Sequence, residues 1–351
     1  MPGMKITGTG RYLPGEPVTN SALARVMDTN DEWIVQRTGI TQRYFAEPGQ
    51  GPADLALPAC RAALAAAELE PTQIDYLLFS TMTPDYVFPG SGALLAAQLG
   101  TGTAPALDLR TQCAAFLFSL QVADGLLRAG AARRVLIVGA EAHAGLMPWK
   151  DWDILRGQRD GTASDVARAH ATAHRGWSVI FGDGAGALVV ERTDDDQRGL
   201  LGIDLHTDGH YATQLHIPSG FRSQPYVSAA DLEAGAHYPV MEGREIFKHA
   251  VTKLPRSARA VCERAHVALG DVDWFVAHQA NQRINDAIGE RLGVDTRRIP
   301  SNIERYGNTS GATIPILLDE MRRDGRLTEG QLLCFLALGA GLHWGSALVR
   351  T

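Results

Sequence analysis

Short apolar runs alternate with stretches of helical periodicity along the whole chain. The segments 73–80 (QIDYLLFS) and 272–278 (VDWFVAH) are typical of buried strands, because apolar runs of this length occur in sheets covered on both faces. Two further apolar runs, at 135–138 and 332–338, predict two more strands. Apolar residues at steps of three and four predict helices between them, and one helix face would carry Phe116, Leu120, Ala123 and Leu127. The pattern predicts the α/β class.

The pattern of the first half recurs in the second. Both segments named first hold an Asp, an aromatic residue and three apolar residues, and each precedes a loop, a helix and another apolar strand. Each half then ends on a Gly-rich turn and a strand, at 181–190 and 339–349. We predict a duplicated α/β unit with halves 1–195 and 196–351, which meet at the polar stretch TDDDQR. Two unrelated α/β domains are the alternative interpretation.

One stretch has no counterpart in the second half. Residues 142–174 are polar and contain glycine, where the second half has only a short turn. This pattern predicts a surface insertion within the first half.

Composition narrows the classes of function. The 351 residues are 45% hydrophobic and 21% charged, which is typical of a folded globular protein, and the net charge of −6 argues against nucleic-acid and anionic-membrane partners. The first residues hold no apolar signal segment, and no run long enough to span a membrane occurs, so we expect a cytoplasmic protein. The four cysteines are far apart and form no CxxC pair, so neither a disulfide framework nor a metal site is expected.

Three polar residues stand where α/β folds place chemistry. Cys113 follows an extended segment and precedes a helix, whose free N–H groups would stabilise a thiolate there; a small buried side chain is the alternative. His278 ends a predicted strand, and Asn308 lies in the turn RYGNTSGAT before another helix. Taken singly, each could instead be a structural histidine or a turn residue. The Gly-rich segment GDGAGALVV runs into a strand and precedes no Walker lysine, which argues against a nucleotide loop.

Together, these segments resemble the β-ketoacyl-acyl-carrier-protein synthase III family of condensing enzymes. The likeness rests on Cys113, HQAN at 278–281, GNTS at 307–310, DEWIVQRTGI at 31–40, RGWSVIFGDGAGA at 175–187 and GAGLHWGSALVR at 339–350. It implies the thiolase fold, in which two βαβαβαββ halves form five layers in the order αβαβα. It also implies a homodimer.

The resemblance implies a two-step acyl transfer that uses no cofactor, because the coenzyme A thioesters are its substrates. An acyl-coenzyme A would load Cys113, with the oxyanion held by the backbone N–H groups of Cys113 and Ala340. A malonyl thioester, on coenzyme A or acyl carrier protein, would then lose carbon dioxide. His278 and Asn308 would donate hydrogen bonds to the enolate, which attacks the acyl-enzyme to give a β-ketoacyl thioester.

The resemblance also assigns residues to substrate binding. Trp33 and Arg175 would enclose the adenine of coenzyme A, Arg37 and Thr38 would hold its nucleotide end, and Arg244, Asn281 and Arg283 would lie near the tunnel mouth. Phe88 matches the residue that crosses the dimer interface to close the partner's acyl pocket. Leu338 stands beside His278 where the family commonly has Phe, which would widen the acyl pocket.

The chain departs from the common pattern in two further places. RTQC replaces the small residues usual before the cysteine and resembles the branch that serves specialised metabolism, although housekeeping-like members share it. The insertion at 142–174 precedes Arg175 and would lie near the coenzyme A entrance. Fatty-acid initiation and a polyketide-like pathway therefore both stay open, as does the starter acyl group.

Two other functions compete with condensation. The first is acyl transfer from Cys113 to an alcohol or amine, which would not need the enolate donor Asn308. The second is an inactive partner subunit that only shapes an acyl pocket, which would not need Cys113. The presence of both residues favours condensation.

Overall fold

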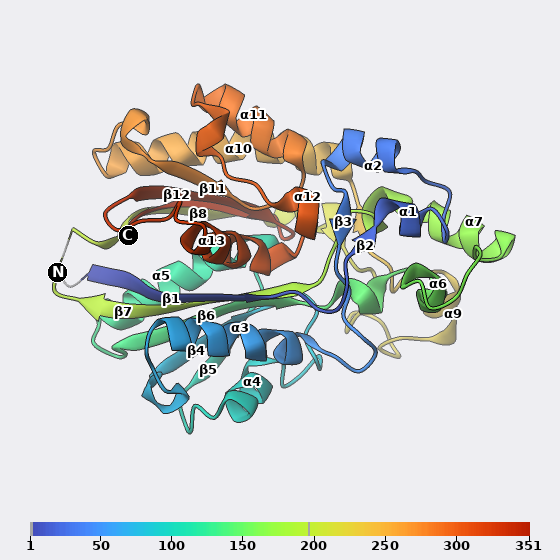
Figure 1. The fold of residues 1–351 in the computed structure, drawn as a ribbon, viewed down its shortest axis with the longest axis horizontal. Helices are drawn as coiled ribbons and strands as arrows, with labels where there is room; N and C mark the ends of the chain where they lie inside the picture. The colour runs from blue at the N-terminus through green and yellow to red at the C-terminus, as the bar shows by residue number, and fades with distance from the viewer. Residues whose placement is uncertain (1–2, 196) are drawn as a thin grey trace.

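The computed structural model describes residues 3–195 and 197–351, so residues 1–2 and residue 196, where the predicted second half begins, lie outside the described residues. The described chain forms two larger sheets and the helices that cover them (Figure 1). The remaining described strands form two small sheets of two strands each: β2 (Val18–Thr19) pairs with β3 (Gln42–Arg43), and β9 (Leu215–His216) pairs with β10 (Val240–Met241).

The first sheet has the strand order β1-β7-β6-β4-β5. Its strands are β1 (Gly3–Tyr12), β4 (Tyr76–Ser80), β5 (Ala106–Leu109), β6 (Arg134–Glu141) and β7 (Gly184–Thr193). The pairs β1–β7 and β7–β6 are antiparallel, and β6–β4 and β4–β5 are parallel. The predicted strand at 73–80 is thus shorter than expected, because residues 71–73 form a 3₁₀ turn.

The second sheet repeats this arrangement in the order β8-β13-β12-β11. Its strands are β8 (Gly199–Thr207), β11 (Trp274–Ala277), β12 (Leu332–Gly339) and β13 (His343–Arg350). The pairs β8–β13 and β13–β12 are antiparallel and β12–β11 is parallel, as in the first four strands of the other sheet. The repeat predicted from the apolar runs is therefore present in the topology.

Helices cover both sheets and separate them, which gives five layers (Figure 1). The central layer holds α5 (Ala115–Arg128) and α13 (Thr313–Arg323), both with many buried side chains. The outer layers hold α3 (Pro52–Ala66) and α4 (Gly92–Leu99) on the first sheet, and α10 (Gly243–Arg264) and α11 (Gln282–Leu292) on the second.

The predicted apolar face of α5 packs between the sheets. Phe116, Leu120, Ala123 and Leu127 are all buried in one cluster with side chains of both sheets. Phe116 meets Phe335 of β12 edge-to-face, with 5.2 Å between ring centroids. The central helices therefore join the two halves through a shared apolar core.

Short helices form a lobe at one end of the layers (Figure 1). They are α1 (Asn20–Leu23), α2 (Asp31–Thr38), α6 (Trp152–Leu155), α7 (Asp165–Ala173), α8 (Arg175–Ser178) and α9 (Ala229–Glu233); α12 (Ile303–Tyr306) lies nearby. The predicted insertion at 142–174 contributes α6 and α7 to this lobe. It is not a wholly solvated surface segment, because Trp149 and Ile154 are buried in a cluster with residues of α1 and α2.

Candidate active site

Cys113 lies in the 3₁₀ turn Gln112–Ala114 that runs directly into α5. Its side chain is buried, with Sγ 3.3 Å from Oγ of Ser310. Burial raises the pKa of the Cys113 thiol to about 12, although the Ser310 hydrogen bond acts in the opposite direction. Burial thus opposes the thiolate expected at a helix start, because the loss of hydration outweighs the N–H groups of the turn.

The end of β12 passes very close to the nucleophile. A Cβ added at Gly339 would lie 2.8 Å from the backbone nitrogen of Cys113, so a side chain there would clash with backbone. Ala340, which follows, lines the same cavity as Cys113. This close approach brings the two backbone segments of the predicted oxyanion hole together.

His278 follows the last residue of β11 and is buried. Its Nδ1 lies 2.7 Å from the hydroxyl of Thr313, and that hydroxyl is 2.9 Å from the carbonyl oxygen of Ser310, to which it can donate. Burial lowers the pKa of His278 to about 3, so the imidazole is neutral at physiological pH. Thr313 therefore sets the orientation of a neutral ring.

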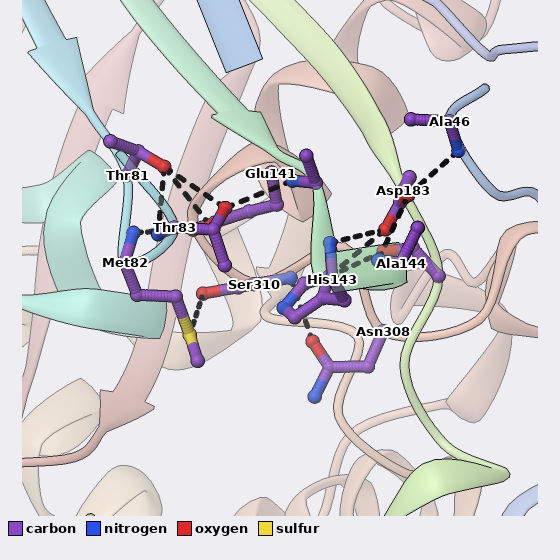
Figure 2. Close-up of polar contacts among 12 residues, drawn as sticks. Ala46, Thr81, Met82, Thr83, Glu141, His143, Ala144, Asp183, Asn308 and Ser310 are labelled. Carbon is purple, nitrogen blue, oxygen red and sulfur yellow. Dashed lines mark hydrogen bonds and ion pairs between the residues drawn. The ribbon is translucent and has the colours of Figure 1, made fainter. Parts of the chain in front are cut away.

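Asn308 is held by backbone and side-chain bonds on three sides. Its N–H donates to the carbonyl of Ile180 (2.9 Å), and its own carbonyl accepts from the N–H of Gly182 (3.0 Å). The side-chain Oδ1 accepts from the N–H of Ser310 at 2.8 Å, as Figure 2 shows. The amide Nδ2 is thus the end left for a substrate.

A cavity of about 420 Å³ brings most of the predicted site residues together. Among the residues that line it are Trp33, Arg37, Thr38, Cys113, Arg244, His278, Asn281, Arg283, Asn308 and Leu338. The nucleophile comes from the first half of the chain, and the other two predicted catalytic residues come from the second. The cavity therefore lies between the halves.

Two of the predicted binding residues use their side chains within the protein. The Thr38 hydroxyl is buried and donates to the carbonyl of Ile34 in its own helix. The Asn281 amide donates to the carbonyl of Arg37 at 2.8 Å and accepts from the N–H of Arg283 at 2.9 Å. Both residues therefore shape the wall of the cavity, and Asn281 ties α11 to the end of α2.

Two guanidinium groups contact the ring of Trp33. The Arg37 and Arg175 carbons Cζ lie 4.5 and 4.8 Å from the ring centroid. An adenine between Trp33 and Arg175 would need two stacking distances, about 7 Å in all. The residues predicted to enclose the adenine are thus adjacent, but the gap between them is too narrow for the base in this conformation.

A second, larger cavity also reaches the nucleophile. It has a volume of about 740 Å³ and is lined by Cys113 and Ala340 together with residues of the segment 212–239. Phe181 lines both cavities. Phe88, which was expected at an acyl pocket, lines neither cavity and is 80% exposed on the single chain.

A buried carboxylate network lies behind the site (Figure 2). Glu141, at the end of β6, accepts hydrogen bonds from the hydroxyls of Thr81 and Thr83 and from the N–H of Met82. Burial raises the pKa of Glu141 above its usual range. Since Met82 Sδ in turn contacts the Ser310 hydroxyl at 3.3 Å, this network orders the loop beside the nucleophile.

The sequence interpretation missed Ser310, Thr313 and Glu141. Ser310 and Thr313 stand in the motif that carries Asn308, so their signal was proximity to a candidate residue. Glu141 follows an apolar strand, and polar residues at the carboxyl ends of strands often belong to sites. In the part of the chain that the structure describes, no cluster of three His, Cys, Asp or Glu side chains could hold a metal ion. Within the same residues, no helix has the length and apolar character needed to cross a membrane.

Known proteins match the chain over almost its whole length. The family model 3-oxoacyl-[acyl-carrier-protein (ACP)] synthase III matches residues 107–209, and the model of its C-terminal part matches residues 262–351. A β-ketoacyl-[acyl-carrier-protein] synthase III of Synechococcus sp. is 42% identical over 349 residues, which cover 99% of this chain and 96% of that relative.

Solved structures of similar proteins share the fold of this chain over almost its whole length. The 3-oxoacyl-[acyl-carrier-protein] synthase III of Aquifex aeolicus is 35% identical with a TM-score of 0.85, and the match covers 99% of this chain and 100% of that one. A priming β-ketosynthase from a polyketide biosynthetic pathway is 33% identical with a TM-score of 0.84, and the match covers 99% and 96%.

Proposed function

The chain belongs to the β-ketoacyl-acyl-carrier-protein synthase III family of condensing acyltransferases, and on this premise we propose that Cys113, His278 and Asn308 carry the reaction. One observation supports the assignment most directly. Cys113 lines two cavities, and His278 and Asn308 also line one of them. An acyl group can thus occupy one cavity while a second thioester approaches through the other.

The first step is transfer of an acyl group from coenzyme A to Cys113. Because the resting thiol is neutral, it must lose its proton as the sulfur attacks the thioester carbonyl. His278 is too weak a base for the free thiol, but it can take the proton at Nε2 as the C–S bond forms, because the attacking sulfur then becomes strongly acidic; Thr313 accepts a hydrogen bond from Nδ1–H. The backbone N–H groups of Cys113 and Ala340 stabilise the oxyanion, and the proton then leaves with the thiol of coenzyme A.

The second step needs donors where the first needed a base. When the malonyl thioester loses carbon dioxide, the electrons of the broken bond place negative charge on its thioester oxygen. The Nδ2 of Asn308 donates to this oxygen, since the Ser310 N–H already occupies Oδ1. His278 donates from Nε2 in its other tautomer: Nδ1 releases its proton to solvent, Nε2 takes one from solvent, and the Thr313 hydroxyl turns from the Ser310 carbonyl to donate to Nδ1. The enolate carbon then attacks the acyl-enzyme carbonyl, the C–S bond breaks, and Cys113 leaves as a thiolate that takes a proton from solvent.

The substrate carriers follow from the cavity and from the relatives. Arg37, Arg244 and Arg283 line the cavity of Asn308, and guanidinium groups suit the phosphates of coenzyme A. Trp33 and Arg175 separate to admit the adenine, because the ring gains a stacking partner on each face. We propose acyl carrier protein as the malonyl carrier, in keeping with the names of the relatives.

We further propose that each chain consists of two similar halves, 1–195 and 196–351, and that two copies of the chain form a homodimer. Strand β5 is an edge strand with a 39% exposed Leu107, and such an edge is a template for pairing with another chain. The neighbouring strand β4 leads into a loop in which Tyr86, Val87 and Phe88 are exposed. A second copy would cover both features and bring Phe88 to its acyl pocket.

Intact-protein mass spectrometry tests the function. We expect a mass gain of one acyl group after incubation with an acyl-coenzyme A, no gain for Cys113→Ala, and a β-ketoacyl product after a malonyl thioester is added. The same gain on Cys113→Ala would exclude the nucleophile. If the acyl-enzyme forms but only an alcohol or amine is acylated, simple acyl transfer replaces condensation.

A further inference from the structure

Glu141 is a buried acid that the two steps proposed above do not use. It ends β6, and its side chain is inaccessible to solvent. Its oxygens accept hydrogen bonds from the N–H of Met82 and from the hydroxyls of Thr81 and Thr83. Because carboxyl groups with a shifted pKa gather at functional sites, Glu141 is a candidate for proton transfer to or from the nucleophile.

The Ser310 hydroxyl connects Glu141 to the nucleophile. Its Oγ is 3.3 Å from Sγ of Cys113, and no other side chain of residues 3–195 and 197–351 forms a hydrogen bond with that sulfur. Burial raises the pKa of Glu141, and the Ser310 hydroxyl is among the groups that act against this rise by stabilising the charged carboxylate. A Cβ added at Gly311, the next residue, would lie 3.8 Å from Oε1 of Glu141. Ser310 therefore lies next to both the sulfur and the acid, and Figure 2 shows the acid and the hydroxyl.

The sulfur of Cys113 needs a proton when it leaves the acyl-enzyme. After the enolate carbon attacks, the C–S bond breaks and its electron pair stays on the sulfur. Burial raises the pKa of the Cys113 thiol to about 12, so a free thiolate is unfavourable in this site. The two cavities that Cys113 lines then hold the substrates, so a proton donor within the protein has an advantage over water.

We propose that Ser310 and Glu141 deliver this proton. As the C–S bond breaks, the Ser310 hydroxyl gives its proton to Sγ and takes the proton of the Glu141 carboxyl group, which becomes a carboxylate. Glu141 then regains a proton from solvent, so the proton that Cys113 receives still comes from water. The proposal rests on the proposed function, because it requires that an acyl group be transferred from Cys113.

The surroundings of Glu141 suit this role. Burial raises its pKa more than the charge of His143 and the hydrogen bond from Thr83 lower it, so the carboxyl group gains a proton more readily than an ordinary one. The Thr83 hydroxyl donates to Glu141 at 2.8 Å, and Thr83 also lines the larger cavity. Water in that cavity can therefore replace the proton after the product has left.

A single-turnover experiment tests the proposal. Cys113 is acylated from the fastest of butyryl-, octanoyl- and benzoyl-coenzyme A, and a malonyl thioester is added. Both the β-ketoacyl thioester and the acetyl thioester that forms when an enolate is protonated are measured. In Ser310→Ala and Glu141→Gln the β-ketoacyl product should form about 10²-fold more slowly, as loss of a general acid predicts. The acetyl thioester should become the larger product, because His278 and Asn308 still stabilise the enolate.

Acylation of Cys113 should change little in the same variants. We expect rates within about threefold of the wild type, because His278 is the base in that step. Alkylation of Cys113 by iodoacetamide should be at least as fast in Glu141→Gln as in the wild type, since the charge of Glu141 adds to the rise that burial causes in the thiol pKa. Slow condensation with undiminished alkylation would separate proton delivery from damage to the nucleophile.

A matched variant controls for the loss of a buried hydroxyl. Ser119, in the same helix that follows the nucleophile, is fully buried and pairs with Ser80 at 3.0 Å. Ser119→Ala should therefore keep the wild-type rates of both steps and the wild-type ratio of products.

The outcomes separate this proposal from the proposed function. If Ser310→Ala and Glu141→Gln keep the wild-type condensation rate and product ratio, the proton path is wrong and the condensing function stands. Equal losses in acylation and condensation, without a larger share of acetyl thioester, would also overturn the path. If Ser310→Ala does not fold by circular dichroism, Glu141→Gln decides. If the folded wild type forms an acyl-enzyme that never condenses, the proposed function itself fails.

Discussion

Replacement of Asn308 should separate the two steps of the reaction. Its Nδ2 is the proposed donor to the enolate, and its Oδ1 accepts the Ser310 N–H at 2.8 Å. Asn308→Ala removes both functions, whereas Asn308→Asp keeps an acceptor for Ser310 and removes the donor when it is ionised. Acylation of Cys113 precedes the enolate, so it should proceed in both variants at close to the wild-type rate.

The size of the effect follows from these contacts. Loss of one of two oxyanion donors lowers a rate by about 10²–10³-fold. In Asn308→Ala the buried Ser310 N–H also loses its acceptor, which costs about 1–3 kcal/mol of stability. Asn308→Asp should avoid that loss of a partner, and its carboxylate would repel the enolate. Its condensation rate relative to the wild type should rise as pH falls, because a protonated carboxyl regains a donor.

Single-turnover experiments measure the two steps separately. Protein is first acylated and freed of excess donor, and a malonyl thioester is then added while both the acyl-enzyme and the product are followed by mass spectrometry. Thermal denaturation of each variant measures stability in parallel. A condensation rate in Asn308→Ala within threefold of the wild type would refute the role given to Nδ2. Equal losses in acylation and condensation would indicate a structural defect instead.

Three other results should follow from the site. Alkylation of Cys113 by iodoacetamide in the resting protein should rise with pH through the neutral and mildly alkaline range, because the thiol pKa is raised to about 12; a plateau near neutral pH would contradict this. Thr313→Val should move the hydrogen of His278 from Nδ1 to Nε2, as nitrogen NMR would show, and should slow acylation about tenfold. Thr313→Ser should keep the wild-type tautomer and the wild-type acylation rate. An unchanged tautomer in Thr313→Val would exclude the positioning role. Trp33→Ala should raise KM for an acyl-coenzyme A about tenfold or more, because the adenine loses an aromatic ring on which it stacks. KM for the same acyl group on pantetheine, which has no adenine, should not change. An equal rise in KM for both donors would place the adenine elsewhere.

Some parts of the fold and site were readable from the order of residues alone. The apolar runs around Leu78 and Val276 predicted buried strands, because a run this apolar is stable only when both faces of its sheet are covered. The helix face of Phe116 and Leu120 followed from periodicity, which depends only on the geometry of one helix. The family motifs placed Cys113, His278 and Asn308, and the structure brings all three to one cavity.

Other features depend on contacts between segments that are distant in the chain. The pKa of Cys113 is raised because the surrounding chain removes water from it, an effect that outweighs the local influence of the helix start. The Thr313 hydroxyl reaches His278 only because the first residue of α13 lies against the residue that follows β11. The insertion acquires buried residues only through its contact with α1 and α2.

The linear pattern thus specifies which segments become strands and helices, since propensity and periodicity are local properties. It also names the reactive side chains, since their chemistry belongs to the residue type. Burial, protonation and cavity shape are properties of the packed whole. They raise the pKa of the Cys113 thiol and pair the side chains of Asn281 and Thr38 with backbone groups of the cavity wall. They also leave Oε1 of Gln112 without a hydrogen-bond partner among the described residues.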